Sequence, residues 1–135
     1  MAILDILDDI IIQLKNNITD LQIEMFPDKP QEYRLIHPKG AILVSFNSSD
    51  YTKLNSFDYF QQVETLQIGL ILILRGVRNT DGSYAYLDKI ESVLSGFEPS
   101  GCTKMYPIRK SFLIQDEGIW QHSFIFGTTK ENFIA

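Results

Sequence analysis

Hydrophobic residues recur over the first 18 positions at the three- and four-residue spacing of an amphipathic helix. Asp5 lies near the start of this segment and Lys15 near its end, and both positions suit the helix dipole. The pattern therefore predicts a helix over residues 3–18. It would pack against the core through a single stripe of aliphatic residues: Ile3, Leu7, Ile10, Ile11, Leu14 and Ile18.

A second helix is predicted over residues 84–95, because both of its ends carry terminating signals. Asp81 or Ser83 can accept hydrogen bonds from the first free amides. Gly96 suits the position after the last turn, and Pro99 follows shortly after it. The stripe that would face the core consists of Tyr86, Leu87, Ile90, Val93 and Leu94.

Shorter apolar segments separated by turn residues predict strands. The strongest is residues 62–75, where five aliphatic residues at every second position share one face. Its other face begins polar and ends apolar, which indicates a strand covered on both sides at one end. Further extended segments are predicted at 21–26, 31–36 and 41–46, with a turn at 37–40 and a hairpin of 108–115 and 119–128 that turns at Asp116-Glu117-Gly118.

Residues 47–60 form the least regular part of the pattern and are predicted to be a long loop. Turn-forming Asn, Ser and Asp residues alternate there with large hydrophobic ones, namely Tyr51, Leu54, Phe57, Tyr59 and Phe60. A loop of this length in a compact domain is usually functional or disordered. Two interpretations stay open: the five residues contact another protein or subunit, or they fold back onto the core. Residues 130–135 are expected to form a flexible tail.

The order of helix, strands, helix and hairpin predicts one α+β domain spanning residues 1–135. Its sheet would be mostly antiparallel, with both helices packed on one face. A crossover through the second helix would make the sheet mixed, and this alternative stays open. A chain of 135 residues, 44% of them hydrophobic and 21% charged, is typical of one such domain.

Charge and cysteine content narrow the classes of partner. The formal net charge of −5 argues against specific nucleic-acid binding, which usually needs a basic face. The single cysteine, Cys102, cannot form an internal disulfide and favours a reducing compartment. The longest apolar run, residues 68–74, is too short for a membrane helix, and the acidic N-terminus does not resemble a signal peptide. We expect a soluble cytoplasmic protein without a membrane partner.

The sequence carries no recognisable catalytic or metal-binding constellation. His37 precedes a proline in a turn, and His122 lies between Trp120 and Phe124 on an apolar strand face. Neither histidine has further ligands at metal-binding spacing, so His122 is expected to be a core or interface residue whose ring nitrogens find partners. Cys102 lies in a Pro-Ser-Gly-Cys-Thr loop that lacks the setting of a reactive thiol. No catalytic residue, metal or cofactor is predicted, and the expected role is assembly with other proteins.

Three blocks of residues carry a resemblance to a known family. The first contains Pro27, Tyr33-Arg34-Leu35 and the run from His37 to Val44. The second contains the runs 82–88 and 94–99 with Gly101-Cys102, and the third is Gly118-Ile119-Trp120-Gln121. Together they resemble the small tail-completion proteins of Mu-like phages and prophages, which are similar in role to tail terminators.

The resemblance implies a small α+β subunit, without catalytic residues, that forms a hexameric ring. Such a ring sits on the last ring of the tail tube, stops its growth and offers a surface to the head-tail connector. The implied partners are other copies of the chain, the tube protein and the connector. The implied location is the host cytoplasm during assembly and the virion tail afterwards. The alternative is a small cytoplasmic regulatory or inhibitor protein that binds another protein as a monomer or dimer.

Overall fold

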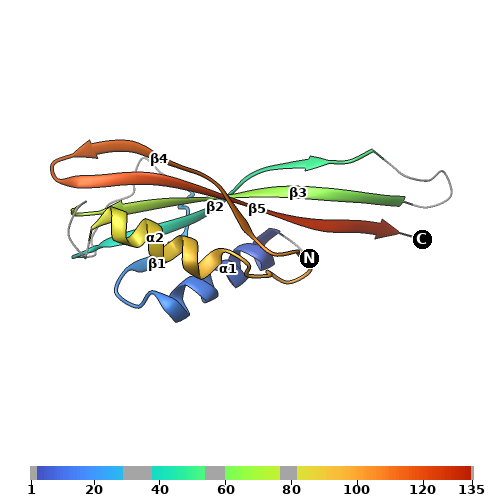
Figure 1. Ribbon diagram of the computed structural model, residues 1–135, viewed down its shortest axis with the longest axis horizontal. Helices are drawn as coiled ribbons and strands as arrows, with labels where there is room; N and C mark the ends of the chain where they lie inside the picture. The colour runs from blue at the N-terminus through green and yellow to red at the C-terminus, as the bar shows by residue number, and fades with distance from the viewer. Residues whose placement is uncertain (1–2, 29–37, 54–59, 77–81, 135) are drawn as a thin grey trace.

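The computed structural model describes residues 3–28, 38–53, 60–76 and 82–134, with the backbone alone at 60, 61 and 131–134. Two helices and five strands form the fold (Figure 1). In chain order they are α1 (Ile3–Asn17), β1 (Gln22–Met25), β2 (Gly40–Tyr51), β3 (Phe60–Leu74), α2 (Ser83–Leu94), β4 (Tyr106–Asp116) and β5 (Ile119–Ile134). The segment predicted as extended at 31–36 and His37 lie outside the described residues.

The five strands form one mixed sheet in the order β1-β2-β3-β5-β4. β1 pairs with β2 in parallel, and the other three pairs are antiparallel. α2 makes a crossover, because β4 runs in the same direction as β3 while β5 lies between them. Both helices lie on the same side of the sheet (Figure 1), so the α+β prediction is confirmed. The sheet is mixed, but its parallel pair is β1 with β2 and is not formed by the α2 crossover.

The core lies between the two helices and one face of the sheet. The predicted stripe of β3 is fully buried at Leu66, Ile68, Leu70, Leu72 and Leu74. Burying one such side chain stabilises the fold by about 1.5–3 kcal/mol. On α1 the prediction was wrong at one position: Ile3 is 40% exposed. The buried stripe of this helix is Ile6, Leu7, Ile10, Ile11 and Leu14.

Two segments predicted to be irregular are strands, so the boundaries of the predicted loop and tail were wrong. β2 continues through residues 47–51, and Tyr51 pairs with Glu64 of β3. β5 continues to Ile134, which pairs with Phe60. The Asn and Ser residues of this part of β2 have little intrinsic preference for strands, but neighbouring strands supply backbone partners that local preference cannot anticipate. Within the predicted loop, residues 54–59 lie outside the described part of the chain.

The sheet is longer than the helices that cover it. β3 has 15 residues, which span about 50 Å at roughly 3.3 Å per residue. α1 also has 15 residues, but a helix of that length spans only about 22 Å. β2, β3 and β5 therefore project beyond the helix layer as a three-stranded arm (Figure 1). Among the described residues, no helix is long and apolar enough to cross a membrane.

Local geometry explains the ends of α2 and the β4–β5 turn. Gly96 has a φ of 83°, as expected for a residue that ends a helix. The predicted Ser83 cap is wrong: Ser83 is buried and its Oγ donates to the carbonyl of Gly76 over 3.1 Å, and Gly82 is the N-cap. Asp81 lies outside the described residues. At the turn, Glu117 and Gly118 have φ values of 51° and 80°, which is typical of tight two-residue hairpin loops.

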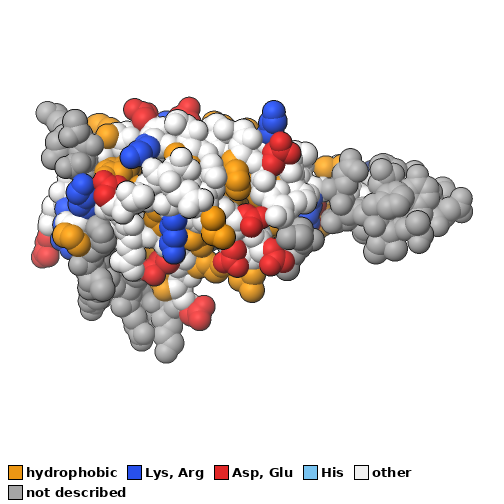
Figure 2. Space-filling view, turned by 90° about the horizontal axis from the view of Figure 1, so that it is seen from below, with side chains coloured by type: hydrophobic (Ala, Val, Ile, Leu, Met, Phe, Trp, Pro, Cys, Tyr) orange, Lys and Arg blue, Asp and Glu red, His pale blue; other side chains and the backbone are white. Residues whose placement is uncertain are grey.

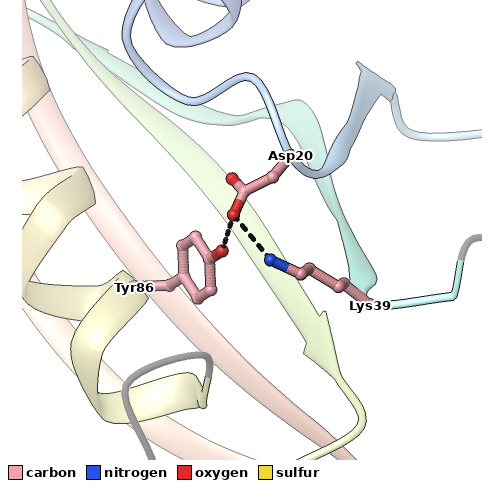
Figure 3. A network of polar contacts seen from close by, with 3 residues as sticks. All are labelled: Asp20, Lys39 and Tyr86. Atoms are coloured by element: carbon pink, nitrogen blue, oxygen red, sulfur yellow. Dashed lines mark hydrogen bonds and ion pairs between the residues drawn. The ribbon is translucent and has the colours of Figure 1, made fainter.

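A small polar network joins α2 to the segments that precede β1 and β2 (Figure 3). The hydroxyl of Tyr86 on α2 donates to Oδ2 of Asp20, which lies between α1 and β1. Lys39, next to the start of β2, places its Nζ 3.1 Å from the same oxygen. The Tyr86 hydrogen bond is the main reason why the pKa of Asp20 is lowered. The network fixes α2 relative to the segment that precedes β1.

Candidate assembly interface

His122 lies buried among aromatic side chains. It is 5% exposed on β5, with Phe112 of β4 5.7 Å and Tyr84 of α2 6.1 Å from its ring. Burial lowers the pKa of His122, which keeps the ring neutral at physiological pH. Its Nδ1 has no hydrogen-bond partner among the described residues, contrary to the expectation that both nitrogens are satisfied. His122 therefore acts as an aromatic spacer between α2 and the sheet.

Cys102 is the second candidate group for chemistry. Its side chain is buried, and that burial is the main cause of its raised pKa. A thiol that resists ionisation is a poor nucleophile and a poor metal ligand. No group of three or more His, Cys, Asp or Glu residues in the described part of the chain is placed to hold a metal ion.

A buried ion pair lies at the base of the arm. Glu64 on β3 and Lys130 on β5 face each other in the antiparallel register, with 3.6 Å between Oε1 and Nζ. Their side chains are 6% and 15% exposed. An ion pair this buried depends on both partners, because removing one charge leaves the other buried without its counter-ion. The pair fixes the register in which the arm leaves the body.

Two of the five residues predicted to contact a subunit or tube protein, Tyr51 and Phe60, lie on described strands of the arm. Tyr51 ends β2 with its side chain 57% exposed, so it does not fold back onto the core. Phe60 begins β3, and its side chain is outside the description. Leu54, Phe57 and Tyr59 lie outside the described residues. For these five residues, the role in contacts between subunits stays a prediction.

Five of the twelve exposed large hydrophobic residues in the described part of the chain lie elsewhere, on β4. This strand is at the edge of the sheet and pairs only with β5. Ten of its eleven residues are exposed. We define the β4 surface as its exposed large hydrophobic side chains together with Arg109: Tyr106, Ile108, Phe112, Leu113 and Ile114, which are 43–55% exposed. Exposed apolar groups this concentrated are typical of a contact with another protein.

The open face of the sheet adds a hollow beside β4. It has a volume of about 350 Å³ and lies on the side away from the helices. Leu113 of β4 lines it, together with Phe26 and Pro27, which follow β1. Leu43, Ile71, Ile73 and Gln121 form the rest of its described lining. The sequence predicted that the second face of β3 is apolar at one end. Ile71 and Ile73 form that apolar end, and both line the hollow.

Sequence reasoning placed β4 in a hairpin but missed its surface. A signal was available in the three consecutive apolar residues Phe112, Leu113 and Ile114. Successive side chains of a strand point to opposite faces, so such a run cannot be buried on one face alone. The structure adds that the run lies on an edge strand, where neither face is fully covered.

A search of curated protein sequences finds no match to this chain. Among solved structures, a chain from the virion of a native gene transfer agent (GTA) particle has a similar fold. The TM-score is 0.60 and the sequence identity 12%, with 95% of this chain and 96% of that chain covered. A family model described as "Gp37 protein" matches residues 10–135. Because that match covers nearly the whole chain, the protein belongs to the Gp37 protein family.

Proposed function

We propose that the protein is a structural component of a phage or phage-like particle. The observation that carries this proposal is the shared fold with a chain of a gene transfer agent virion, because it extends over nearly the full length of both chains. A fold can serve several functions, so the surfaces of this chain must also suit assembly. The exposed β4 surface and the projecting arm both do so.

Within such a particle, the proposed role is that of a tail terminator, or tail-completion subunit. Copies of the chain would form a ring, a hexamer by family resemblance, that caps the tail tube and offers a surface to the head-tail connector. Assembly would take place in the host cytoplasm, and the ring would then remain in the virion tail. The net charge of −5 suits a conduit, because an acidic ring does not hold passing DNA.

The chemistry of the described residues supports a non-enzymatic role. The candidate groups for chemistry, His122 and Cys102, are both buried, and their pKa values are shifted toward the neutral forms. The hollow beside β4 is lined mainly by aliphatic and aromatic side chains, with Gln121 as its polar described residue. Such a lining suits contact with apolar groups of another protein rather than bond-making chemistry.

The test is co-assembly. Purified protein is mixed with assembled tail tubes of the same particle, and tube ends are viewed by electron microscopy. We expect a ring on the tube end and tubes that no longer elongate. Size-exclusion chromatography with light scattering measures whether a ring near six subunits also forms alone. Tubes that elongate unchanged and carry no bound protein would contradict the proposal and favour the small regulatory or inhibitor protein.

A further inference from the structure

Two free strand edges run along the arm. β1 pairs with β2 only at residues 41–44, and the pairing of β4 with β5 ends where Tyr106 meets Gly127. Beyond these points β2, β3 and β5 continue as a three-stranded ribbon. Figure 2 looks onto the helix layer, which covers the body and ends before this ribbon. Among the described residues, the outer sides of β2 and β5 therefore have no strand or helix beside them in the arm.

The β2 edge, which we define as the backbone of residues 48–51, can donate hydrogen bonds to a further strand. The amide of Thr52 donates to the carbonyl of Val63 on β3 over 2.9 Å. Successive residues of an antiparallel strand alternate between bonded and non-bonded positions, so the amides of Ser49 and Tyr51 point away from β3. Neither amide has an acceptor in the described part of the chain. Tyr51 also places a phenol ring that is 57% exposed at the end of this edge.

The β5 edge, which we define as the backbone of residues 131–134, lies on the other side of the ribbon. The amide of Thr103 donates to the carbonyl of Thr129 over 2.8 Å, so the backbone groups of Thr129 point away from β3. The same alternation directs the amides of Glu131 and Phe133 outward. β5 pairs with β3 along its whole length without a bulge. The β5 edge is therefore regular and can accept a neighbouring strand.

The outer edge of β4 differs from both edges of the arm. Its pairing with β5 is interrupted between Pro107 and Arg109 and again between Phe112 and Ile114. Proteins use bulges, and prolines that cannot donate a hydrogen bond, to prevent strands from pairing at an edge. Neither the β2 edge nor the β5 edge contains a proline or a bulge. The arm is therefore where main-chain hydrogen bonds can continue the sheet into another chain.

The two edges of the arm suit each other in direction and in length. β2 and β5 are both antiparallel to β3, so they run in the same direction. In a cyclic assembly every copy of a strand keeps its direction relative to the rotation axis. The β5 edge of one copy would therefore meet the β2 edge of the next in parallel. Each edge spans four residues, and a copy added at either edge presents the same free edge again.

The two edges also lie at different levels along the arm. Val63 bonds to Thr52 on β2 and pairs with Glu131 on β5, so the β5 edge begins four residues nearer the tip than the β2 edge. Four residues are about 13 Å along a strand, and the three strands of one arm are about 14 Å wide. Such a displacement per copy corresponds to a strand tilt of about 43°, within the range of roughly 35–45° that closed barrels need. The stagger within one arm therefore fits a closed ring of arms.

We infer that the β5 edge of one copy of this chain pairs in parallel with the β2 edge of a second copy. A second copy is the partner because one chain carries both edges, which are unlike, parallel and staggered as a closed sheet requires. The contact is head-to-tail, and repeated contacts of this type generate a ring when the rotation between neighbours closes. The inference deepens the proposed function and rests on it for the closed ring.

Two proline variants test the pairing of the edges. Ser49→Pro removes an outward amide of the β2 edge, and Glu131→Pro removes one of the β5 edge. Each is expected to weaken self-association by about tenfold or more, because a hydrogen-bond donor is lost and the proline ring obstructs the neighbouring strand. In a mixture, the first variant keeps its β5 edge and the second keeps its β2 edge. Light scattering should therefore show that neither variant assembles alone, whereas the mixture forms a dimer and stops there.

Matched controls separate the backbone from the side chains. Ser49→Ala and Glu131→Ala shorten the same side chains but keep the amides, so both should assemble like the wild type. Circular dichroism and urea midpoints should stay close to those of the wild type in all four variants, because the outward amides form no hydrogen bond within the described chain. If either proline variant unfolds, Tyr51→Pro or Phe133→Pro repeats the test at the next outward amide of the same edge.

Four results would overturn the inference. The first is a wild-type chain that stays monomeric at concentrations up to about millimolar, the weak limit for a specific contact. The second is assembly of either folded proline variant at wild-type strength, which would indicate pairing of like edges or a contact elsewhere. The third is an equal loss of assembly in an alanine control, and the fourth is a mixture that stays monomeric. A chain that fails in any of these ways and still caps tail tubes would overturn only the pairing of the edges and leave the proposed function intact.

Discussion

The helices do not cover the sheet at the arm or at β4, and these two regions differ in which groups they bury and which they expose to solvent. In the arm, three strands pair with one another, and the pair of Glu64 and Lys130 buries its charges at the base. On β4, one edge has no neighbouring strand among the described residues, and large hydrophobic side chains face solvent. The arm is therefore stabilised within the chain, whereas the exposed side chains of β4 are those that we propose contact a second protein.

The largest effect is expected at the base of the arm. Lys130→Met leaves the Glu64 carboxylate buried without its cation, and the free energy of unfolding should fall by about 3 kcal/mol. Urea denaturation followed by circular dichroism measures this loss. Adding Glu64→Leu to the same chain should restore much of it, because the stranded charge is then removed. A single variant as stable as the wild type would show that the arm does not depend on this pair.

A smaller effect is expected at the network of Asp20, Lys39 and Tyr86. Tyr86→Phe removes the hydroxyl that donates to Asp20 and should lower the free energy of unfolding by about 1 kcal/mol near pH 7. The expected loss of stability is small because the Asp20 side chain is 37% exposed and solvent weakens its interactions.

The same network predicts a dependence on pH. The pKa of Asp20 is lowered by folding, so its stabilisation is fully present above the ordinary carboxyl pKa of about 4 and is lost as pH falls through the folded value. The difference in stability between the wild type and Tyr86→Phe should therefore shrink below about pH 4. Urea midpoints measured between pH 3 and pH 7 test this, and a constant difference over that range would argue against the network.

On β4 the expected effect on folding is much smaller. Ile114→Thr changes a side chain that is 51% exposed, so the free energy of unfolding should change by less than about 0.5 kcal/mol. If β4 is completed by another protein, the same variant should weaken assembly as measured by light scattering. A large loss of stability in the monomer would place Ile114 in the fold rather than in a contact.

The smallest effect on folding is expected at Tyr51. The charge of Glu64 raises the pKa of Tyr51, yet the phenol ring remains largely exposed at the end of β2. Tyr51→Ser removes the interaction of the exposed phenol with Glu64, so the urea midpoint should fall only slightly, and a larger effect on assembly can be assigned to a contact. Weakened assembly would support the prediction that the arm contacts a subunit or the tube, and wild-type assembly would indicate that the side chain of Tyr51 makes no such contact.

Both helices, the hairpin and the central strand could be predicted from the sequence because their signals are local. The spacing of apolar residues in α1, the terminating Gly96 and the turn at Glu117 and Gly118 each need only a few neighbouring residues. The buried face of β3 is equally evident, since every second residue from Leu66 to Leu74 is aliphatic. Of the predicted interface, only exposed Tyr51 is described with its side chain.

The sequence by itself determined the composition of the core, the two helices and the absence of recognisable catalytic motifs. The tertiary structure decided that residues 47–51 and 130–134 are strands, since their backbone partners lie far away in the chain. It also decided that β4 is an edge with exposed apolar residues, because strand order depends on the packing of the whole sheet. Local preference is encoded residue by residue, whereas pairing and exposure arise only when distant segments meet.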